Sequence, residues 1–230
     1  MNRTDGLASV LEIGPGVGVI TRPMSERLPV HAVEIDSGVL PALRDFAPLA
    51  RVTEGDALQF DWAGALGELP QPVGIVSNMP YNITGPLLEK VVGCSGLIDR
   101  AVLMMQREVG DKILAPVGDR NRGNLSVFIQ AVFDVSRVCL VPPGAFRPPP
   151  KVESIVLDFR PRADVNLSHL QERVFPWVRR GFVQPRKTLV NNLRGLGEVA
   201  SVLGELGVSP TIRPHEVTWE AWVKIAEAQR

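Results

Sequence analysis

Short apolar runs alternate with segments of helical periodicity through the first two thirds of this 230-residue chain, and this alternation is its strongest constraint. The apolar runs fall at residues 7–13, 30–33, 51–53, 73–77 and 101–105, with two later runs at 127–138 and 155–159. Helical patterns fall near 21–28, 37–47, 84–93 and 107–115. Strands that alternate with helices form a parallel sheet covered on both faces. The sequence therefore predicts an α/β fold.

A proline-rich segment and a change of periodicity mark the end of this pattern. Prolines fix φ and remove backbone donors, so we expect residues 141–152 to form an extended loop between the last two strands. Beyond residue 162, apolar residues recur at helical spacing as far as Ile225. We therefore predict an α/β domain at 1–162 and a small all-helical domain at 163–230.

Composition narrows the class of protein. The hydrophobic fraction of 45% and the charged fraction of 22% are typical of globular chains. The first residues, MNRTDG, lack the apolar core of a secretory signal, and no run of 18 apolar residues occurs, so we expect neither secretion nor a membrane span. Two cysteines and three scattered histidines predict no metal site and favour the cytoplasm.

Charge is distributed unevenly although the net charge is zero. Residues 1–99 carry 6 basic and 12 acidic side chains, whereas residues 100–194 carry 16 basic and 8 acidic ones. A basic region can attract a polyanion even when the whole chain is neutral.

Three motifs that follow the expected strands suit a nucleoside ligand. Gly14, Gly16 and Gly18 have the spacing G-x-G-x-G, which differs from the G-x-G-x-x-G of dinucleotide sites and disfavours a nicotinamide dehydrogenase. Glu34 ends the second run, where a carboxylate can accept both hydroxyls of a ribose. Asp56 follows the third run and can accept the amine of an adenine. No phosphate-binding lysine follows the glycines, so S-adenosylmethionine is the expected cofactor.

The fourth motif, Asn78-Met79-Pro80-Tyr81, is the most informative one, and it contains the only tyrosine of the chain. The Asn78 amide and the Met79 carbonyl can accept the two hydrogens of an amino group on a planar ring. Tyr81 can stack on that ring. These residues predict a pocket for a base whose amine is the reacting group.

These motifs, in this order, resemble those of the S-adenosylmethionine-dependent rRNA adenine N6-dimethyltransferases, and within them the KsgA/RsmA family. The matching stretches are LEIGPGVG, VEID, EGDA, NMPYNI, PGAFRPPPKVES at 143–154 and FVQPRKTLVNNL at 182–193. The resemblance implies a Rossmann-like class I methyltransferase domain at 1–162 and a helical rRNA-docking domain at 163–230. Pro185 stands where the family usually has a basic residue. The family also carries an arm with a Gln-Asn-Phe-Leu motif ahead of the first strand, and we expect this chain to lack it.

The resemblance also implies a reaction and a set of site residues. It implies dimethylation of N6 of two adjacent adenosines near the 3′ end of 16S rRNA, in the small ribosomal subunit or its precursor. Because the sulfonium of the cofactor is already a strong electrophile, we expect no metal. We also expect a monomer, since nothing in the sequence suggests an obligate oligomer. Asn78, Tyr81 and Phe146 are the expected catalytic residues, with the two rings on opposite faces of the target adenine. The expected cofactor residues are Gly14, Gly16, Glu34, Asp56 and Asn78. Arg147, Lys151, Arg186 and Lys187 are the expected rRNA contacts.

Three other functions stay open at this point. A ribosome-assembly or RNA-binding factor with weak or no catalysis would use the same surface. A 23S rRNA adenine N6-methyltransferase shares most of the motifs. A methyltransferase for DNA or for a glutamine side chain shares the N-x-P-Y pocket, although the helical tail and the basic loop argue against it.

Overall fold

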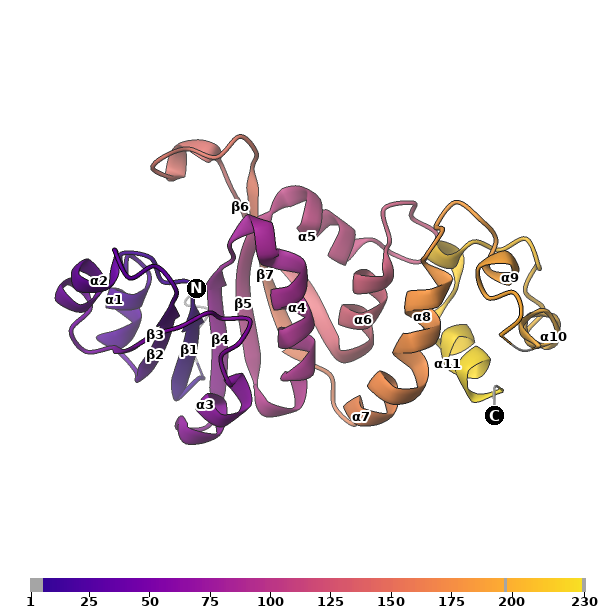
Figure 1. The fold of residues 1–230 in the computed structure, drawn as a ribbon, viewed down its shortest axis with the longest axis horizontal. Helices are drawn as coiled ribbons and strands as arrows, with labels where there is room; N and C mark the ends of the chain where they lie inside the picture. Colours follow the sequence, from indigo (N-terminus) through magenta and orange to yellow (C-terminus); the bar gives the residue numbers. More distant parts are fainter. Residues whose placement is uncertain (1–5, 197, 229–230) are drawn as a thin grey trace. The chain divides into compact units, whose positions relative to one another are not determined.

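A computed structural model describes residues 6–196 and 198–228 of the chain. Seven strands form one sheet in the order β3-β2-β1-β4-β5-β7-β6, and Figure 1 shows them side by side with α4 across one face. Their bounds are β1 Ser9–Ile13, β2 Val30–Glu34, β3 Arg51–Glu54, β4 Val73–Asn78, β5 Arg100–Gln106, β6 Phe133–Val141 and β7 Ser154–Pro161. This mixed sheet with its flanking helices confirms the predicted fold class.

The first five strands pair in parallel, as predicted, and β1 is buried along its whole length. Parallel strands carry continuous apolar runs because helices cover both faces of the sheet. The last two strands depart from this expectation: β7 runs antiparallel to both β5 and β6. A plain loop can join antiparallel strands directly, whereas parallel strands need a crossover connection.

A short α-helix comes after each of the five parallel strands. These helices are α1 Thr21–Ser25, α2 Leu40–Phe46, α3 Trp62–Glu68, α4 Thr84–Gly93 and α5 Arg107–Leu114. The sequence patterns predicted four of these five and missed α3. Asp61 caps α3 by accepting a hydrogen bond from the backbone N–H of Gly64, and Trp62, Ala65 and Leu66 form its buried face. The sequence signal for this helix is therefore an acidic N-cap residue followed by apolar residues at i, i+3 and i+4.

The apolar run at 127–138 was wrongly predicted to be one strand. Residues Asn124–Val132 form helix α6, and strand β6 begins only at Phe133. Six of the nine residues of α6 are buried and none is fully exposed, so the helix lacks the exposed polar face that would reveal a helical period. Gln130 fixes the helix by donating from Nε2 to the carbonyls of Ile113 and Ala115 at 2.8 and 2.9 Å.

The proline-rich loop connects β6 to β7, as predicted. Figure 1 shows it projecting beyond the ends of these strands. A single 3-10 turn, η3 at Pro143–Ala145, is the regular structure within it.

The C-terminal segments are helical, as predicted. They are α7 Leu167–His169, η4 Leu170–Val174, α8 Phe175–Gly181, α9 Leu189–Asn192, α10 Val199–Glu205, η5 Pro214–Glu216 and α11 Trp219–Glu227. Aromatic rings form much of their core. Phe128 of α6 packs on Phe175 with ring centroids 4.3 Å apart, and Phe182 stacks on Trp222 at 6.0 Å. Gly181 lies directly against the Trp222 ring, where a side chain would not fit.

Backbone proximity divides the chain into two compact units. The sheet unit comprises positions up to Gly110 together with Phe133–Ala163, and the helical unit comprises Asp111–Val132 together with the positions from Asp164 onward. The chain passes from the sheet unit to the helical unit for the last time between Ala163 and Asp164, whereas the sequence predicted a boundary at 162/163. Residues 111–132, however, pack with the later helices, so a single cut does not separate the units. Across the described residues, no helix combines the length and the apolar character needed to cross a membrane.

Candidate active site

The carboxyl ends of three neighbouring strands meet at one edge of the sheet. Ile13 of β1 pairs with Val33 of β2 and with Ser77 of β4. The residues that follow these three strands therefore lie at the same edge of the sheet. Ligands of open α/β sheets bind beyond this edge. The structure therefore places the glycine loop, Glu34 and Asn78 at the end of the sheet where a cofactor would bind.

The glycine loop needs the backbone freedom of glycine. Gly14, Gly16 and Gly18 all have positive φ, at 69°, 57° and 90°. Gly14 also faces the neighbouring motif, because a Cβ at this position would lie 3.7 Å from the Pro80 ring. Positive φ strains any side chain at these positions, and the close approach at Gly14 shows that the loop packs against the Asn78–Tyr81 turn.

Glu34 joins the glycine loop to the end of β2. Its side chain is buried, and Oε2 accepts a hydrogen bond from the backbone N–H of Gly16 at 2.9 Å. Oε1 accepts from the N–H groups of Ile35 and Asp36 at 2.9 and 3.0 Å. Three backbone donors thus hold the carboxylate in one orientation, and one of its four lone-pair sites, on Oε2, remains to accept a further hydrogen bond.

Asp56 lies close to this group, after β3. The backbone N–H of Gly55 donates to the Glu34 carbonyl at 2.8 Å, which ties the two strand ends together. Asp56 is half-buried, and its Oδ1 accepts from the N–H of Leu58 at 2.8 Å. The carboxylate is therefore fixed in place by its own turn.

Asn78 ends β4 and is half-buried at the start of the turn. Within residues 6–196 and 198–228, no hydrogen bond engages its side-chain amide. The turn around it is well held: the Met79 N–H donates to the Met104 carbonyl at 2.9 Å, and Thr84 Oγ1 donates to the Pro80 carbonyl at 3.1 Å. A rigid turn thus presents a polar amide that is available to a ligand.

Tyr81 and Phe146, the two expected stacking residues, come from different segments of the sheet unit. Tyr81 begins the 3-10 turn η1 Tyr81–Ile83 and is half-buried. Its hydroxyl lies 2.6 Å from Oγ of Ser154, the first residue of β7. Phe146 is half-buried in the loop between β6 and β7, which also carries the exposed Arg147 and Lys151. In the described part of the chain the two rings do not touch each other.

Glu12 is a buried acid that the sequence analysis did not single out, although it lies within the glycine motif. It is 2% exposed, two residues before Gly14. Burial raises its pKa from the ordinary 4.5 to about 7, repulsion from Glu34 acts in the same direction, and the nearby Thr21 hydroxyl opposes both. Among the described residues, neither Oε2 of Glu12 nor Oγ1 of Thr21 has a hydrogen-bond partner. Burial is therefore the main reason that Glu12 keeps its proton to a higher pH than an exposed carboxyl group does.

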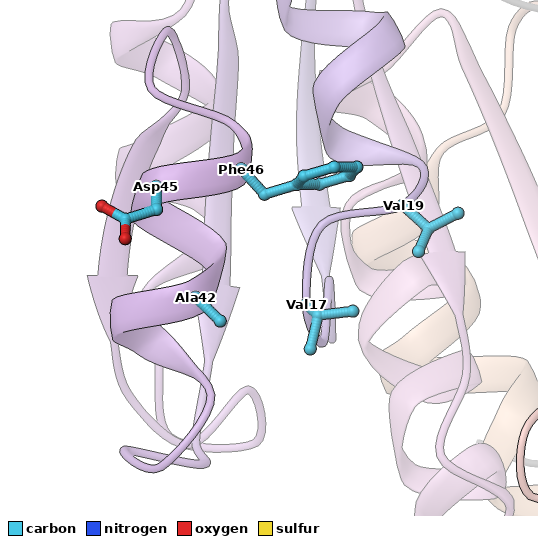
Figure 2. A pocket seen from close by; sticks show the side chains of 5 residues that line it. All are labelled: Val17, Val19, Ala42, Asp45 and Phe46. Atoms are coloured by element: carbon cyan, nitrogen blue, oxygen red, sulfur yellow. The ribbon is translucent and has the colours of Figure 1, made fainter.

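An apolar groove of about 430 Å³ lies beside the glycine loop. Figure 2 shows Phe46 reaching from α2 toward the segment that carries Val17 and Val19, with Ala42 and Asp45 on the same helix. The guanidinium of Arg22 lies over the Phe46 ring, 4.9 Å from its centroid. None of the five expected cofactor residues lines this groove, so it is distinct from the group at the strand ends.

A second groove, of about 450 Å³, lies in the helical unit and is basic. It is lined by Arg180, Val183, Gln184, Lys187, Asn191, Asn192 and Arg194. Asn192 fixes the loop that forms it, by accepting from the Gln184 N–H at 2.9 Å and donating to the Gln184 carbonyl at 3.0 Å. Lys187, an expected rRNA contact, lines this groove, and Arg186 is exposed nearby in sequence but is not among the lining residues.

The structure therefore brings together Gly14, Gly16, Glu34, Asp56 and Asn78, while Arg186 and Lys187 lie in the other compact unit. In residues 6–196 and 198–228, no three histidine, cysteine or acidic side chains cluster as they would around a metal ion.

Known proteins resemble this chain over nearly its full length. The family described as ribosomal RNA adenine dimethylase matches residues 6–228. A "Ribosomal RNA small subunit methyltransferase A" from Syntrophotalea carbinolica is 41% identical over 95% of this chain and 84% of its own length. The protein of the same name from Laribacter hongkongensis is 39% identical over 94% and 83%.

Two solved structures share the fold. A dimethyladenosine transferase from Plasmodium falciparum superposes with a TM-score of 0.78 at 25% identity, covering 94% of this chain and 88% of its own. The 23S rRNA methyltransferase ErmE superposes with a TM-score of 0.69 at 27% identity, covering 96% and 90%.

Proposed function

The chain belongs to the ribosomal RNA adenine dimethylase family, and on that premise we propose that it dimethylates N6 of two adjacent adenosines near the 3′ end of 16S rRNA. The small ribosomal subunit or its precursor is the proposed substrate. The observation that carries the proposal is the group of Gly16, Glu34, Asp56 and Asn78 at one sheet edge, where carboxylates and an amide lie beside a glycine loop.

These residues suit S-adenosylmethionine as the methyl donor. Glu34 is held by three N–H groups with one lone-pair site on Oε2 left to accept a ribose hydroxyl, and Asp56 can accept a hydrogen bond from an adenine amine. Gly14 and Gly16 keep side chains out of the space above the strand ends. The bound cofactor supplies an electrophilic methyl group, so the reaction requires no metal from the protein.

The protein's main task is to orient the nucleophile. Adenine N6 shares its lone pair with the ring. Hydrogen bonds from N6 to the Asn78 amide oxygen and the Met79 carbonyl would localise that pair and direct it at the methyl group. Orientation of this kind contributes about 7–11 kcal/mol in favourable systems. The proton that N6 loses can pass to water, and we assign no general base.

The target adenine must leave its stack to reach this turn. Tyr81 and Phe146 are the proposed walls of its pocket, and stacking contributes about 1–3 kcal/mol per base. The roles of these two rings follow from their positions: one ends the β4 turn, and the other lies in the loop that leaves β6 and returns at β7.

Basic side chains in both units are the proposed rRNA contacts. Arg147 and Lys151 lie in the loop of Phe146, while Arg186 and Lys187 lie in the helical unit beside the basic groove. Contacts of this kind bind phosphates and position the RNA without reading its sequence. We further propose that the protein acts as a monomer in the cytoplasm, in keeping with its two free cysteines.

The test is transfer of labelled methyl groups to small ribosomal subunits that lack the modification, with 23S rRNA as the control because ErmE acts on that RNA. Label recovered as dimethyladenine in the small subunit alone supports the proposal. Label in 23S rRNA alone assigns the chain to that substrate instead. Subunit binding without label identifies an assembly factor that does not methylate.

A further inference from the structure

The hydrogen bond between Tyr81 and Ser154 links two parts of the proposed active site. The Tyr81 hydroxyl and Ser154 Oγ are 2.6 Å apart, a short separation for two hydroxyl groups. Ser154 is completely buried. A buried hydroxyl without a partner costs free energy, so each of these groups favours the geometry in which the bond forms.

Ser154 stands at a fixed point of the sheet. It is the first residue of β7, and it pairs with Gln106 at the end of β5 and with Val141 at the end of β6. Its neighbour Glu153 is also held, because the Arg107 N–H donates to the Glu153 carbonyl at 2.9 Å and the Arg107 guanidinium pairs with the Glu153 carboxylate at 2.7 Å. Three strands therefore fix the position of the Ser154 hydroxyl.

Tyr81 is held at its other end by the turn. Its backbone follows Pro80, whose carbonyl accepts from the N–H of Ile83 at 3.2 Å and from Oγ1 of Thr84 at 3.1 Å. Only the two side-chain torsions of Tyr81 then remain to be set. The bond to Ser154 restrains both of them, because it anchors the far end of the ring.

We propose that Ser154 is a positioning residue that fixes the Tyr81 ring for stacking on the target adenine. The same bond ties that ring to the base of the loop carrying Phe146, since this loop leaves β6 after Val141 and returns at Ser154. Ser154 thereby fixes the Tyr81 ring relative to the base of the loop that carries Phe146, the second proposed wall of the base pocket. This inference rests on the proposed function, and specifically on the stacking role of Tyr81.

The experiment compares Ser154→Ala, Tyr81→Phe and the double variant in methyl transfer to small subunits. Each single variant removes the bond and retains the aromatic ring. We expect kcat to fall about tenfold in each, with the KM for subunits unchanged because phosphate contacts govern docking. The double variant should match the single ones, since both changes remove the same interaction.

Ser9→Ala is the matched control. Ser9 is also completely buried, and its hydroxyl donates a bond of the same 2.6 Å length, to the Pro70 carbonyl at the opposite end of the sheet. This variant should lower the melting temperature while leaving kcat unchanged. A spectroscopic readout is also available: Tyr81 is the only tyrosine, so labelled tyrosine gives one set of ring NMR signals. Those signals should move in Ser154→Ala and stay in place in Ser9→Ala.

The outcomes separate this inference from the proposed function. Wild-type kcat in both Ser154→Ala and Tyr81→Phe, combined with an inactive Tyr81→Ala, overturns the positioning role and leaves the stacking role intact. A kcat that falls equally in Ser9→Ala reduces the bond to a general stabilising contact and also overturns the inference. Full activity of Tyr81→Ala contradicts the proposed stacking itself. If Ser154→Ala does not fold, Tyr81→Phe decides alone.

Discussion

The two compact units each bury an arginine, and the groups that accept hydrogen bonds from its guanidinium differ between them. In the sheet unit, Arg100 makes two hydrogen bonds of 2.6 Å to the two carboxylate oxygens of Asp158, which is 1% exposed. In the helical unit, Arg122 is 4% exposed, and its Nη1 donates to the carbonyls of Val217 and His215 at 2.8 and 3.3 Å. The first charge is neutralised by a carboxylate, whereas the second is held by neutral carbonyl oxygens.

The surfaces of the two units repeat this difference. The strand-end group of the sheet unit presents Glu34 and Asp56, and a third acid, Glu12, is buried within β1. In the helical unit, Arg180, Lys187 and Arg194 line one groove, and no carboxylate among the described residues pairs with them. Such a division of charge suits one unit to a nucleoside and the other to a polyanion. Four predictions, in order of decreasing effect, test this contrast.

The contrast between the buried arginines predicts unequal losses of stability. Asp158→Ala leaves a buried guanidinium without its counter-charge, and we expect it to lower the free energy of unfolding by about 3–5 kcal/mol. Arg122→Met leaves only carbonyl acceptors without a donor, which should cost about 1–3 kcal/mol. Urea denaturation followed by tryptophan fluorescence measures both. Equal losses would contradict the expectation that an uncompensated buried charge costs more than carbonyl oxygens that have lost a donor.

Removing the amide of the β4 turn should break catalysis without disturbing docking. Asn78→Ala is expected to lower kcat by at least about 10²-fold, because N6 loses an orienting acceptor. Binding to small subunits should be unchanged, since the proposed phosphate contacts are elsewhere. Methyl transfer and sedimentation with subunits measure the two properties. The control is Asn121→Ala, because Asn121 is an exposed asparagine of the helical unit. If Asn78→Ala transfers methyl groups as fast as this control, Asn78 has no part in the mechanism.

Buried Glu12 should make the stability of the protein depend on pH. Because its pKa is raised to about 7 in the folded protein, the folded state binds more protons than the unfolded state between about pH 4.5 and 7. The contribution of Glu12 to stability is therefore greatest below this window and falls as pH rises through it, by about 3 kcal/mol at most. Urea denaturation at pH 5 and pH 8 measures the difference. Glu12→Gln should flatten this dependence, and an unchanged slope in that variant would assign the titration to another group.

Neutralising the basic groove should weaken docking alone. We expect the combined change of Arg180, Lys187 and Arg194 to glutamine to lower the affinity for small subunits. The slope of log affinity against log salt concentration should become shallower by about 0.7–0.9 per lost phosphate contact. At saturating substrate, kcat should stay unchanged. Lys224→Gln in α11 controls for total charge, because Lys224 is exposed and lies outside the groove. An unaltered salt dependence in the triple variant would place the RNA elsewhere.

The strand ends were predictable because their chemistry is local. A glycine motif, Glu34, Asp56 and Asn78 each follow an apolar run, and parallel strands align such positions at one edge. Element type was also predictable wherever one face of an element is polar. It failed for α6, whose residues are buried nearly all round.

Ser154 and Glu12 could not be assigned a role in advance, for different physical reasons. The bond of Ser154 joins residues 73 positions apart, and it exists only because β7 inserts between β5 and β6. The raised pKa of Glu12 reflects burial, which its place in the motif does not reveal. The grouping of residues 111–132 with the later helices is likewise a property of packing, because the segment itself carries no boundary signal.

That grouping has a consequence during synthesis. Helix α6 leaves the ribosome well before its partner Phe175, and at about 5–20 residues per second the nascent chain waits a few seconds for that ring. During this interval Val127, Phe128 and Ile129 have no complete core to enter. The sheet unit can finish first, because β7 ends at Pro161, before Phe175 is synthesised. Helix α6 is therefore the segment that waits, and a nascent chain halted at this stage exposes an apolar helix that chaperones can bind.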